Sequence, residues 1–255
     1  MKQDPSVSIV MPNYNKGKFL EESINSIIFQ DYKNWNLFLI DNASTDNTKS
    51  ILSNYNNPKY NIRLVYLTKN KGVAFSRNLG IRLSKSKYIA FIDSDDYWDS
   101  NKLKNQINFM EKFNYNFTYT DYTPFFLKNN IKVFKKIVSP RKTFNFNEFI
   151  NDTSIATSSM IIRKSIIDTT KFPKIKTLED YCFKCALFKK GYEATKLNQN
   201  SMYYRITKNS LSSNKLRSLY WSWYINRKYN KLSFFKCIKS AILISLSSLK
   251  RYGFK

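Results

Sequence analysis

Short apolar runs alternate with amphipathic segments through the first hundred residues, and this alternation restricts the fold more than any other feature. The runs are rich in β-branched and aromatic residues, and the segments between them repeat their apolar residues at helical spacing. Strands that alternate with helices form βαβ units, whose strands pair in parallel. We therefore expect an α/β fold with a Rossmann-like, mostly parallel central sheet flanked by helices. The runs are 7–11, 37–41, 62–67 and 88–93, and the helical segments are 19–29, 45–55 and 73–83.

Beyond residue 99 the pattern is less regular. Helical spacing continues at 102–113 and 178–190, and a last helical stretch runs from 213 to about 251. Strands are expected near 116–122, 132–138 and 158–165, with a further pair around 194 and at 202–206. Because these strands are not separated by regular helices, we expect a mixed sheet in this half.

The composition excludes several classes of protein. With 42% hydrophobic and 24% charged residues among 255, the chain should fold rather than stay disordered. It has no histidine, so acid–base chemistry must fall to carboxylates, Lys, Tyr or Cys.

A zinc site needs about four nitrogen or sulfur ligands, so we interpret Cys182, Cys185 and Cys237 as packed thiols. No signal-peptide run or uninterrupted apolar segment of about 18 residues occurs, which favours a cytoplasmic protein.

Polar residues follow three of the expected strands at the point where each ends. They are Asn13-Tyr14-Asn15, Asp41-Asn42 and Asp93-Ser94-Asp95-Asp96. In open parallel sheets, ligands bind beyond the carboxyl ends of the strands, so these clusters should face one crevice. None of the five glycines forms a phosphate-binding G-x-G-x-x-G loop, and nucleotide binding would need another device.

The stretch YIAFIDSDDYWD, residues 88–99, supplies such a device. In an extended segment residues i and i+2 point the same way, so Asp93 and Asp95 should project together while Asp96 turns aside. Two carboxylates can hold a hard divalent cation whose remaining ligands are waters and diphosphate oxygens. Alternatively, these acids only cap the next helix; we expect Asp99 to do no more than that.

Five segments, in order and spacing, resemble the successive motifs of the family 2 glycosyltransferases. They are VSIVMPNYN (7–15), FLIDNASTDNT (38–48), NKGVAFSRNLGI (70–81), YIAFIDSDDYW (88–98) and LEDYCFKCALFKKGY (178–192). The resemblance covers about residues 6–212. It implies a GT-A fold, a nucleotide-diphosphate-sugar donor, a divalent cation (Mn²⁺ or Mg²⁺) and inversion at the anomeric carbon.

The resemblance also implies roles for the acidic residues. Asp41 would read the uracil edge, Asp93 would contact the ribose and help Asp95 to hold the metal, and Asp96 would lie near the donor sugar. A carboxylate accepts the N3–H of uracil, whereas cytosine N3 is itself an acceptor, so the donor is expected to carry uridine. Some relatives add a histidine ligand that this chain lacks, so metal affinity should depend more on the diphosphate. Further donor-site candidates are Pro12, Asn13, Tyr14, Asn70, Ser94 and Arg77. For Arg77 an equal alternative is that it is an ordinary helix residue with its side chain in solvent.

Glu179-Asp180 resembles the family's E-D motif, in which the aspartate is the general base that deprotonates the acceptor hydroxyl. We assign catalysis to Asp180 and, with less support, to Glu179. The competing interpretation is that Thr177-x-x-Asp180 forms a capping box at the start of a helix. Glu179 would then only interact with the helix N-terminus.

The segment 203–213 resembles the part of the family that closes over the donor phosphates. Arg205, Lys208 and Ser210 are the expected phosphate contacts, although an ordinary basic loop would show the same residues. Trp98, beside the acidic cluster, is assigned to acceptor binding.

The end of the chain is strongly basic. Residues 194–255 contain thirteen Lys or Arg and no Asp or Glu, in a chain whose net charge is +25. Basic residues mixed with aromatic ones are compatible with single-stranded nucleic acid. They also suit an interfacial helix on an anionic membrane, or a helix that packs on its own domain with only its lysines in solvent. Bacterial relatives often use lipid-linked acceptors, so we favour the membrane and expect no nucleic acid.

Taken together, residues 1–212 are expected to form the catalytic domain, with a nucleotide-binding half (1–99), an acceptor-binding half (100–212) and a helical extension at 213–255. The expected activity is metal-dependent, inverting transfer of glucose or galactose from a UDP-sugar to an N-acetylhexosamine on diphosphate-undecaprenol, in surface polysaccharide (O-antigen) synthesis. The C-terminal half is similar to enzymes of that kind. One alternative is a transferase that uses another nucleotide sugar or a protein acceptor. An alternative from a different class is a basic protein that binds nucleic acid. The expected location is the inner face of the cytoplasmic membrane, as a peripheral protein.

Overall fold

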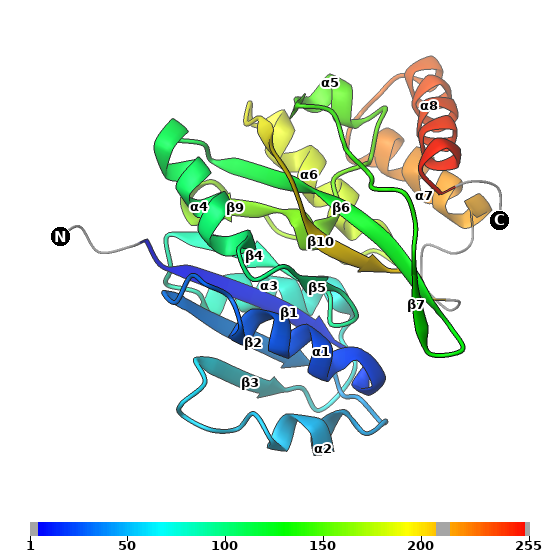
Figure 1. Ribbon diagram of the computed structural model, residues 1–255. Helices are drawn as coiled ribbons and strands as arrows, with labels where there is room; N and C mark the ends of the chain where they lie inside the picture. Colours follow the sequence, from blue (N-terminus) through cyan, green and yellow to red (C-terminus); the bar gives the residue numbers. More distant parts are fainter. Residues whose placement is uncertain (1–4, 208–214, 253–255) are drawn as a thin grey trace.

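The computed structural model describes residues 5–207 and 215–252 (Figure 1). Its first half contains β1 (Val7–Asn13), α1 (Gly17–Ile28), β2 (Trp35–Asp41), α2 (Thr48–Ser53), β3 (Ile62–Tyr66), α3 (Val73–Leu83), β4 (Tyr88–Phe91), β5 (Tyr97–Trp98) and α4 (Lys102–Phe113). The second half contains β6 (Phe117–Lys128), β7 (Ile131–Phe134), β8 (Thr143–Phe144), α5 (Phe146–Phe149), β9 (Ile161–Arg163), α6 (Glu179–Lys189), β10 (Ala194–Arg205), α7 (Lys215–Lys228) and α8 (Phe234–Tyr252). Two short 3₁₀ turns, Thr157–Ser159 and Lys164–Ile166, flank β9.

One sheet runs through both halves in the order β3-β2-β1-β4-β9-β6-β10-β5, with β7 beside β6 and β8 beside β10. The first four strands are parallel, and Val7 lies opposite Trp35 on one side and Tyr88 on the other. α3 approaches this sheet closely because Gly80 has no side chain: a Cβ atom there would lie 2.4 Å from Val10 Cγ1. The expected βαβ architecture is confirmed.

The second half is mixed, as expected. β9 is antiparallel to both β4 and β6 and so joins the halves, while β10 runs parallel to β6. The expected pair of strands around 194 and at 202–206 is one strand, β10, whose register against β6 shifts between Leu197 and Met202. The two short strands β5 and β8 and the one-turn helix α5 are additional elements.

Alternating side chains of the central strands pack into two hydrophobic cores, one on each face of the sheet. Ile9 and Val10 are adjacent and both fully buried, yet they belong to different cores. In the core under α3 and α6, the rings of Phe172 and Phe183 stack with centroids 3.9 Å apart, and Phe91 packs edge-on against both. Cys182 and Cys185 are free, buried thiols in this core, and burial raises the pKa of each to about 12. They are packed thiols.

The C-terminal stretch forms two helices rather than one. α7 and α8 pack against each other at the edge of the molecule, beyond α6 (Figure 1). The break between them contains Lys231 with a positive φ of 57°. Within 5–207 and 215–252, no helix is both long and apolar enough to cross a membrane.

Candidate active site

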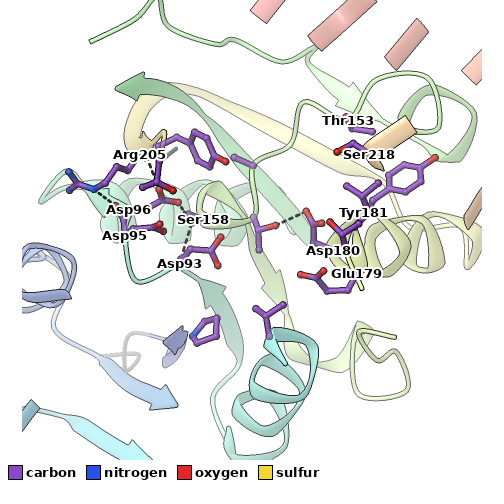
Figure 2. A pocket seen from close by; sticks show the side chains of 18 of the residues that line it. Asp93, Asp95, Asp96, Thr153, Ser158, Glu179, Asp180, Tyr181, Arg205 and Ser218 are labelled. Atoms are coloured by element: carbon purple, nitrogen blue, oxygen red, sulfur yellow. Dashed lines mark hydrogen bonds between the residues drawn. The ribbon is translucent and has the colours of Figure 1, made fainter. Parts of the chain in front are cut away.

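A cavity of about 1020 Å³ opens at the carboxyl ends of β1 and β4 and extends under α7 and α8. Both halves of the chain line it. The first half supplies Pro12 to Lys16, Asn42, Asn70, Arg77 and Asp93 to Asp96; the second supplies Thr157, Ser158, Leu178 to Tyr181, Tyr204 to Thr207 and parts of α7 and α8. Figure 2 shows the carboxylates of the acidic loop, residues 93–96, on one side and those of Glu179 and Asp180 on the other. The sequence clusters expected to face one crevice therefore come together, with the exception of Asp41.

The acidic loop after β4 is a tight turn, closed by a bond from the Asp96 N–H to the Asp93 carbonyl at 3.0 Å. The expected extended segment, with Asp93 and Asp95 aligned as i and i+2, is therefore wrong. Both carboxylates still reach the cavity, but each has its own cationic partner. Asp93 binds Arg77 at 2.7 Å, and Asp95 binds Lys16 at 2.5 Å. Burial raises the pKa of Asp95, and the Lys16 ammonium partly offsets that effect.

Asp96 is almost completely buried, with 1% of its surface exposed. Its carboxylate accepts the Ser158 hydroxyl at 2.6 Å and the Arg205 backbone N–H at 2.9 Å. Burial, followed by the neighbouring charges of Asp95 and Asp93, raises its pKa well above the usual range. The expected position near the donor sugar gains no support from this geometry. Asp96 instead ties the acidic loop to β10.

Ser158, which the sequence analysis did not single out, joins the acidic loop to the second half. Its Oγ accepts the Asp93 N–H at 3.0 Å while donating to Asp96, and its carbonyl accepts Trp98 Nε1–H at 2.8 Å. Trp98 is consequently held in the core, with 3% of its surface exposed, and does not line the cavity. The expected acceptor contact of Trp98 is not supported, because its ring is packed inside the protein.

Asp180 lies at the start of α6 but does not cap it. The residue before the helix is Leu178, which adopts the left-handed conformation (φ 59°), and no side chain caps this end. The capping-box interpretation of Thr177 and Asp180 is therefore wrong. The Asp180 carboxylate instead accepts the Thr157 hydroxyl and the Lys184 ammonium, both at 2.9 Å, and remains about 30% exposed. Burial alone would raise the pKa of Asp180, but Lys184 and Arg77 outweigh it and hold the pKa below the usual range.

Arg77 connects the two groups of carboxylates. It is 4% exposed and donates to Asp93 at 2.7 Å and to Glu179 at 2.6 Å. Its guanidinium also lies 5.3 Å from the centroid of the Phe172 ring. Burial raises the pKa of Glu179, and the guanidinium partly offsets it. The alternative of a solvated helix residue is wrong, and the positive charge between the halves holds the site together.

Asp99 was expected only to begin α4. The residue before that helix is Asn101, and no side chain caps it. Asp99 is partly buried beside Tyr203, and burial raises its pKa while the hydrogen bond to Tyr203 lowers it. The helix-cap interpretation of Asp99 is wrong, because its side chain forms a hydrogen bond with Tyr203 of β10.

The sequence matches the protein family described as "Glycosyl transferase family 2" over residues 8–170. The chain belongs to glycosyltransferase family 2. One relative, "UDP-Glc:alpha-D-GlcNAc-diphosphoundecaprenol beta-1,3-glucosyltransferase WfgD" of Escherichia coli, is 31% identical over 220 residues, which cover 86% of this chain and 85% of that protein. The expected family is thereby confirmed.

Two solved structures share the fold of this glycosyltransferase. TarS 1–349 of S. aureus in complex with UDP-GlcNAc has a TM-score of 0.71 at 19% identity, covering 98% of this chain and 73% of that one. The mannosyltransferase PcManGT of Pyrobaculum calidifontis, in complex with GDP-Man and Mn²⁺, has a TM-score of 0.69 at 15% identity, covering 100% and 77%. The GT-A fold expected from the sequence is confirmed.

The residues expected to hold the base in this glycosyltransferase come from the end of β1 and from the loop between β3 and α3. Pro12, Asn13, Tyr14 and Asn70 line the cavity. Asp41 lies behind them, 1% exposed, where its carboxylate accepts Asn13 Nδ2–H at 3.2 Å and the Ser44 hydroxyl at 2.5 Å. Asp41 is not among the residues that line the cavity, so its expected contact with the uracil edge gains no support from this geometry. By accepting the Asn13 amide, the Asp41 carboxylate holds the Asn13 side chain in place at the cavity wall.

Arg205 lines the cavity, but its guanidinium is already bonded to protein groups. It is 4% exposed, pairs with Glu22 and donates to the Asp95 carbonyl at 2.8 Å. Its guanidinium also lies 4.4 Å and 4.5 Å from the ring centroids of Phe19 and Phe125. In this arrangement Arg205 positions the acidic loop. Lys208 and Ser210, the other expected phosphate contacts, lie outside the described residues.

The carboxylates of Asp93 and Asp95 fit a hard divalent cation. Carboxylate oxygens are the ligands that Mg²⁺ and Mn²⁺ prefer, and Mg²⁺ is often held by one or two carboxylates together with substrate phosphates. Within the described residues, no three His, Cys, Asp or Glu side chains gather around one point. The donor set therefore fits a cation shared with a bound diphosphate rather than one held by the protein alone.

Proposed function

We propose that this glycosyltransferase transfers a hexose, with inversion, from a UDP-sugar to an N-acetylhexosamine on a diphosphate-undecaprenol carrier, in the assembly of a surface polysaccharide such as O-antigen. The observation that carries the proposal is one cavity with the acidic pair, Asp93 and Asp95, on one side and the hydrogen-bonded Asp180 carboxylate on the other. Glucose and galactose are the favoured sugars. The name of the relative WfgD, which specifies UDP-Glc and GlcNAc-diphosphoundecaprenol, supports this choice.

Asp180 is the proposed general base. Its carboxylate accepts the proton of the acceptor hydroxyl as that oxygen attacks the anomeric carbon from the face opposite the diphosphate. The bond between the anomeric carbon and the diphosphate oxygen breaks, and UDP leaves with the electron pair. A single displacement inverts the anomeric centre. Lys184 and Thr157 keep Asp180 ionised and fix its direction, since both donate to Oδ2.

Glu179 is proposed to position rather than to react. Its Oε1 accepts Arg77 Nη1–H at 2.6 Å, and the same guanidinium holds Asp93. Glu179 therefore sets the spacing between the acidic loop and the base.

The acidic pair is the proposed diphosphate end of the site. Asp93 and Asp95 would hold Mn²⁺ or Mg²⁺, which when bound neutralises the charge that develops on the departing diphosphate. Pro12, Asn13 and Tyr14 form the wall on which the uracil would lie, with Asn70 beside it. Asn13 Oδ1 is buried without a hydrogen-bond partner within the described residues, as expected of an acceptor kept for a ligand donor.

The outer face of α8 is the proposed membrane contact. Phe235, Ile238, Ile242 and Leu246 recur at helical spacing and are 80%, 41%, 55% and 58% exposed. Exposed Lys236 and Lys239 lie on the same helix. The alternative was that α8 packs on its own domain with only its lysines in solvent. The helix does pack on its own domain, where the Ser240 hydroxyl bonds to the Ile150 carbonyl, but apolar side chains meet solvent as well as lysines. An exposed apolar stripe with basic neighbours suits an anionic lipid surface.

The same helix also lines the active-site cavity, through Ile244, Ser245, Ser248 and Leu249. Docking of α8 on the inner face of the cytoplasmic membrane would therefore bring the acceptor side of the cavity close to the lipid that carries the acceptor. This arrangement favours a lipid-linked acceptor over a protein.

The proposed activity is tested by incubating the purified protein with Mn²⁺, a synthetic GlcNAc-diphosphate-lipid and a panel of nucleotide sugars. We expect UDP release from UDP-glucose or UDP-galactose that needs acceptor and is lost with EDTA, and NMR of the product should show a β-linkage. Release from a non-uridine donor only, or transfer to protein but not to the lipid, would replace the substrates proposed here. Tight oligonucleotide binding without release from any donor would contradict the proposal as a whole.

A further inference from the structure

A lysine of the protein occupies the carboxylate that the proposed metal would use. Lys16 stands immediately before α1, in the loop after β1, and its Nζ lies 2.5 Å from Asp95 Oδ2. Both side chains line the cavity and are partly exposed, 30% for Lys16 and 16% for Asp95. In the part of the chain that the structure describes, no other side chain donates a hydrogen bond to this carboxylate.

The two carboxylates of the acidic pair are paired in physically different ways. Asp93 is held by Arg77, a guanidinium whose side chain is 5% exposed, which a second carboxylate and an aromatic ring fix in place. Lys16 is a single ammonium on a flexible four-carbon chain at the cavity wall. Breaking the Arg77 pair would leave a charge buried, whereas Lys16 can move its charge into water or onto another anion. The Lys16 pair is therefore the exchangeable one.

An ammonium and a divalent cation cannot share one carboxylate oxygen, because both need the same lone pairs and their charges repel. Among the residues that the structure describes, no third carboxylate gathers with this pair. A cation that arrives alone therefore has to displace Lys16 and gains few protein ligands in return. A cation arriving with a diphosphate has phosphate oxygens as further ligands, and the released ammonium gains an anion to pair with. The pairing thus opposes the metal alone and favours metal and diphosphate together.

We propose that the Lys16 ammonium competes with a divalent cation for the Asp95 carboxylate, so that the divalent cation binds there only together with a nucleoside diphosphate. This inference rests on the proposed function for the identity of the ligands. Lys16 is a positioning residue in this role: it neutralises Asp95 before the ligands bind and pairs with the diphosphate afterwards. The two binding events are coupled through one side chain.

The test is the affinity for Mn²⁺, measured by electron paramagnetic resonance of the free ion, with and without UDP. Lys16→Gln should bind Mn²⁺ about three- to tenfold more tightly than the unaltered protein when UDP is absent, the range expected for loss of one partly exposed competing ion pair. With UDP present this advantage should disappear. Lys16→Arg should keep the low affinity for Mn²⁺ alone, and Asp95→Asn should lose binding in both conditions.

Lys18→Gln is the matched control, because Lys18 is an exposed lysine of the same helix end that does not line the cavity. It removes the same net charge and should leave the Mn²⁺ affinity unchanged. Equal or weaker Mn²⁺ binding by Lys16→Gln without UDP, an equal gain in Lys18→Gln, or no Mn²⁺ binding by any variant would overturn the inference. If the Mn²⁺ affinities of the variants differ as expected but neither the unaltered protein nor any variant transfers sugar, the proposed reaction fails while the competition of Lys16 for Asp95 stands.

Discussion

Lys184 Nζ lies 2.9 Å from Asp180 Oδ2, one turn further along α6, and also donates to the Ile155 carbonyl at 2.7 Å. Its side chain is 2% exposed, so the pair is poorly screened by water. Replacing Lys184 with Met should raise the pKa of Asp180, because its largest favourable charge is lost. A base must be ionised to act, so the acid limb of the turnover profile should move to higher pH by about 1 unit or more.

The measurement is turnover of Lys184→Met across the acid range, with Lys189→Met as the control on the exposed end of the same helix. The folding linkage has the same sign. A carboxyl with a lowered pKa stabilises the fold above its unfolded pKa, and this contribution is lost as the pH falls through its folded pKa. The variant should therefore show a smaller gain in stability between acid and neutral pH. An unshifted acid limb would contradict the role of Lys184.

Ser158→Ala should release the acidic loop. The substitution removes a bond to the buried Asp96 carboxylate and an acceptor for the Asp93 N–H, and it should cost about 1.5–3 kcal/mol in the free energy of unfolding. It should also weaken binding of UDP with Mn²⁺, since Asp93 loses its support. Urea unfolding and calorimetric titration measure both effects. In Ser159 the hydroxyl donates to the Ala156 carbonyl within its own turn, so Ser159→Ala should have a much smaller effect. Equal effects of the two substitutions would contradict this role of Ser158.

Arg77→Met should be among the most destabilising single changes in the site. It leaves Glu179 and Asp93 without their shared cation, and removal of one partner of a buried pair typically costs about 3–5 kcal/mol. The loss should be smaller at acid pH, because burial already raises the pKa of Glu179 and loss of the guanidinium raises it further. Unfolding curves at two pH values measure this difference. A loss matched by the exposed Arg82→Met, or independent of pH, would contradict the bridging role.

The regular elements of the fold could be predicted because they depend on local spacing. The bounds of α3 and α4 agree with the expected 73–83 and 102–113. β10 was divided in two because its register shift interrupts the strand pattern, although pairing with β6 carries the strand through. The two-residue strands β5 and β8 exist only through tertiary pairing and leave no periodic signal.

The site was predictable in residue identity but not in detailed geometry. The capping box at Thr177 failed because Leu178 takes the left-handed conformation, which a sequence pattern does not reveal. Lys184 could have been found from its i+4 spacing to Asp180 on a helix. Ser158 and Lys16 gave no such signal, because their partners lie 62 and 79 residues away in the sequence.

The membrane contact of α8 can be tested with charge inserted into its apolar stripe. The double variant Ile242→Glu/Leu246→Glu should lose most of its binding to vesicles that contain phosphatidylglycerol, because it places two carboxylates in the stripe against an anionic surface. Co-sedimentation measures this binding. Phe113→Glu, at an exposed phenylalanine at the end of α4, is the control and should bind as the unaltered protein does. Undiminished binding of the double variant would exclude this face.

The central claim is that Asp180 removes the acceptor proton, and Asp180→Asn tests it most directly. The amide keeps the shape of the side chain and can still accept from Lys184, and no helix cap is lost because none exists. The decisive measurement compares acceptor-dependent UDP release with UDP-sugar affinity in this variant. We predict a loss of turnover of about 10²-fold or more with donor affinity nearly unchanged. Turnover close to that of the unaltered protein would contradict the account.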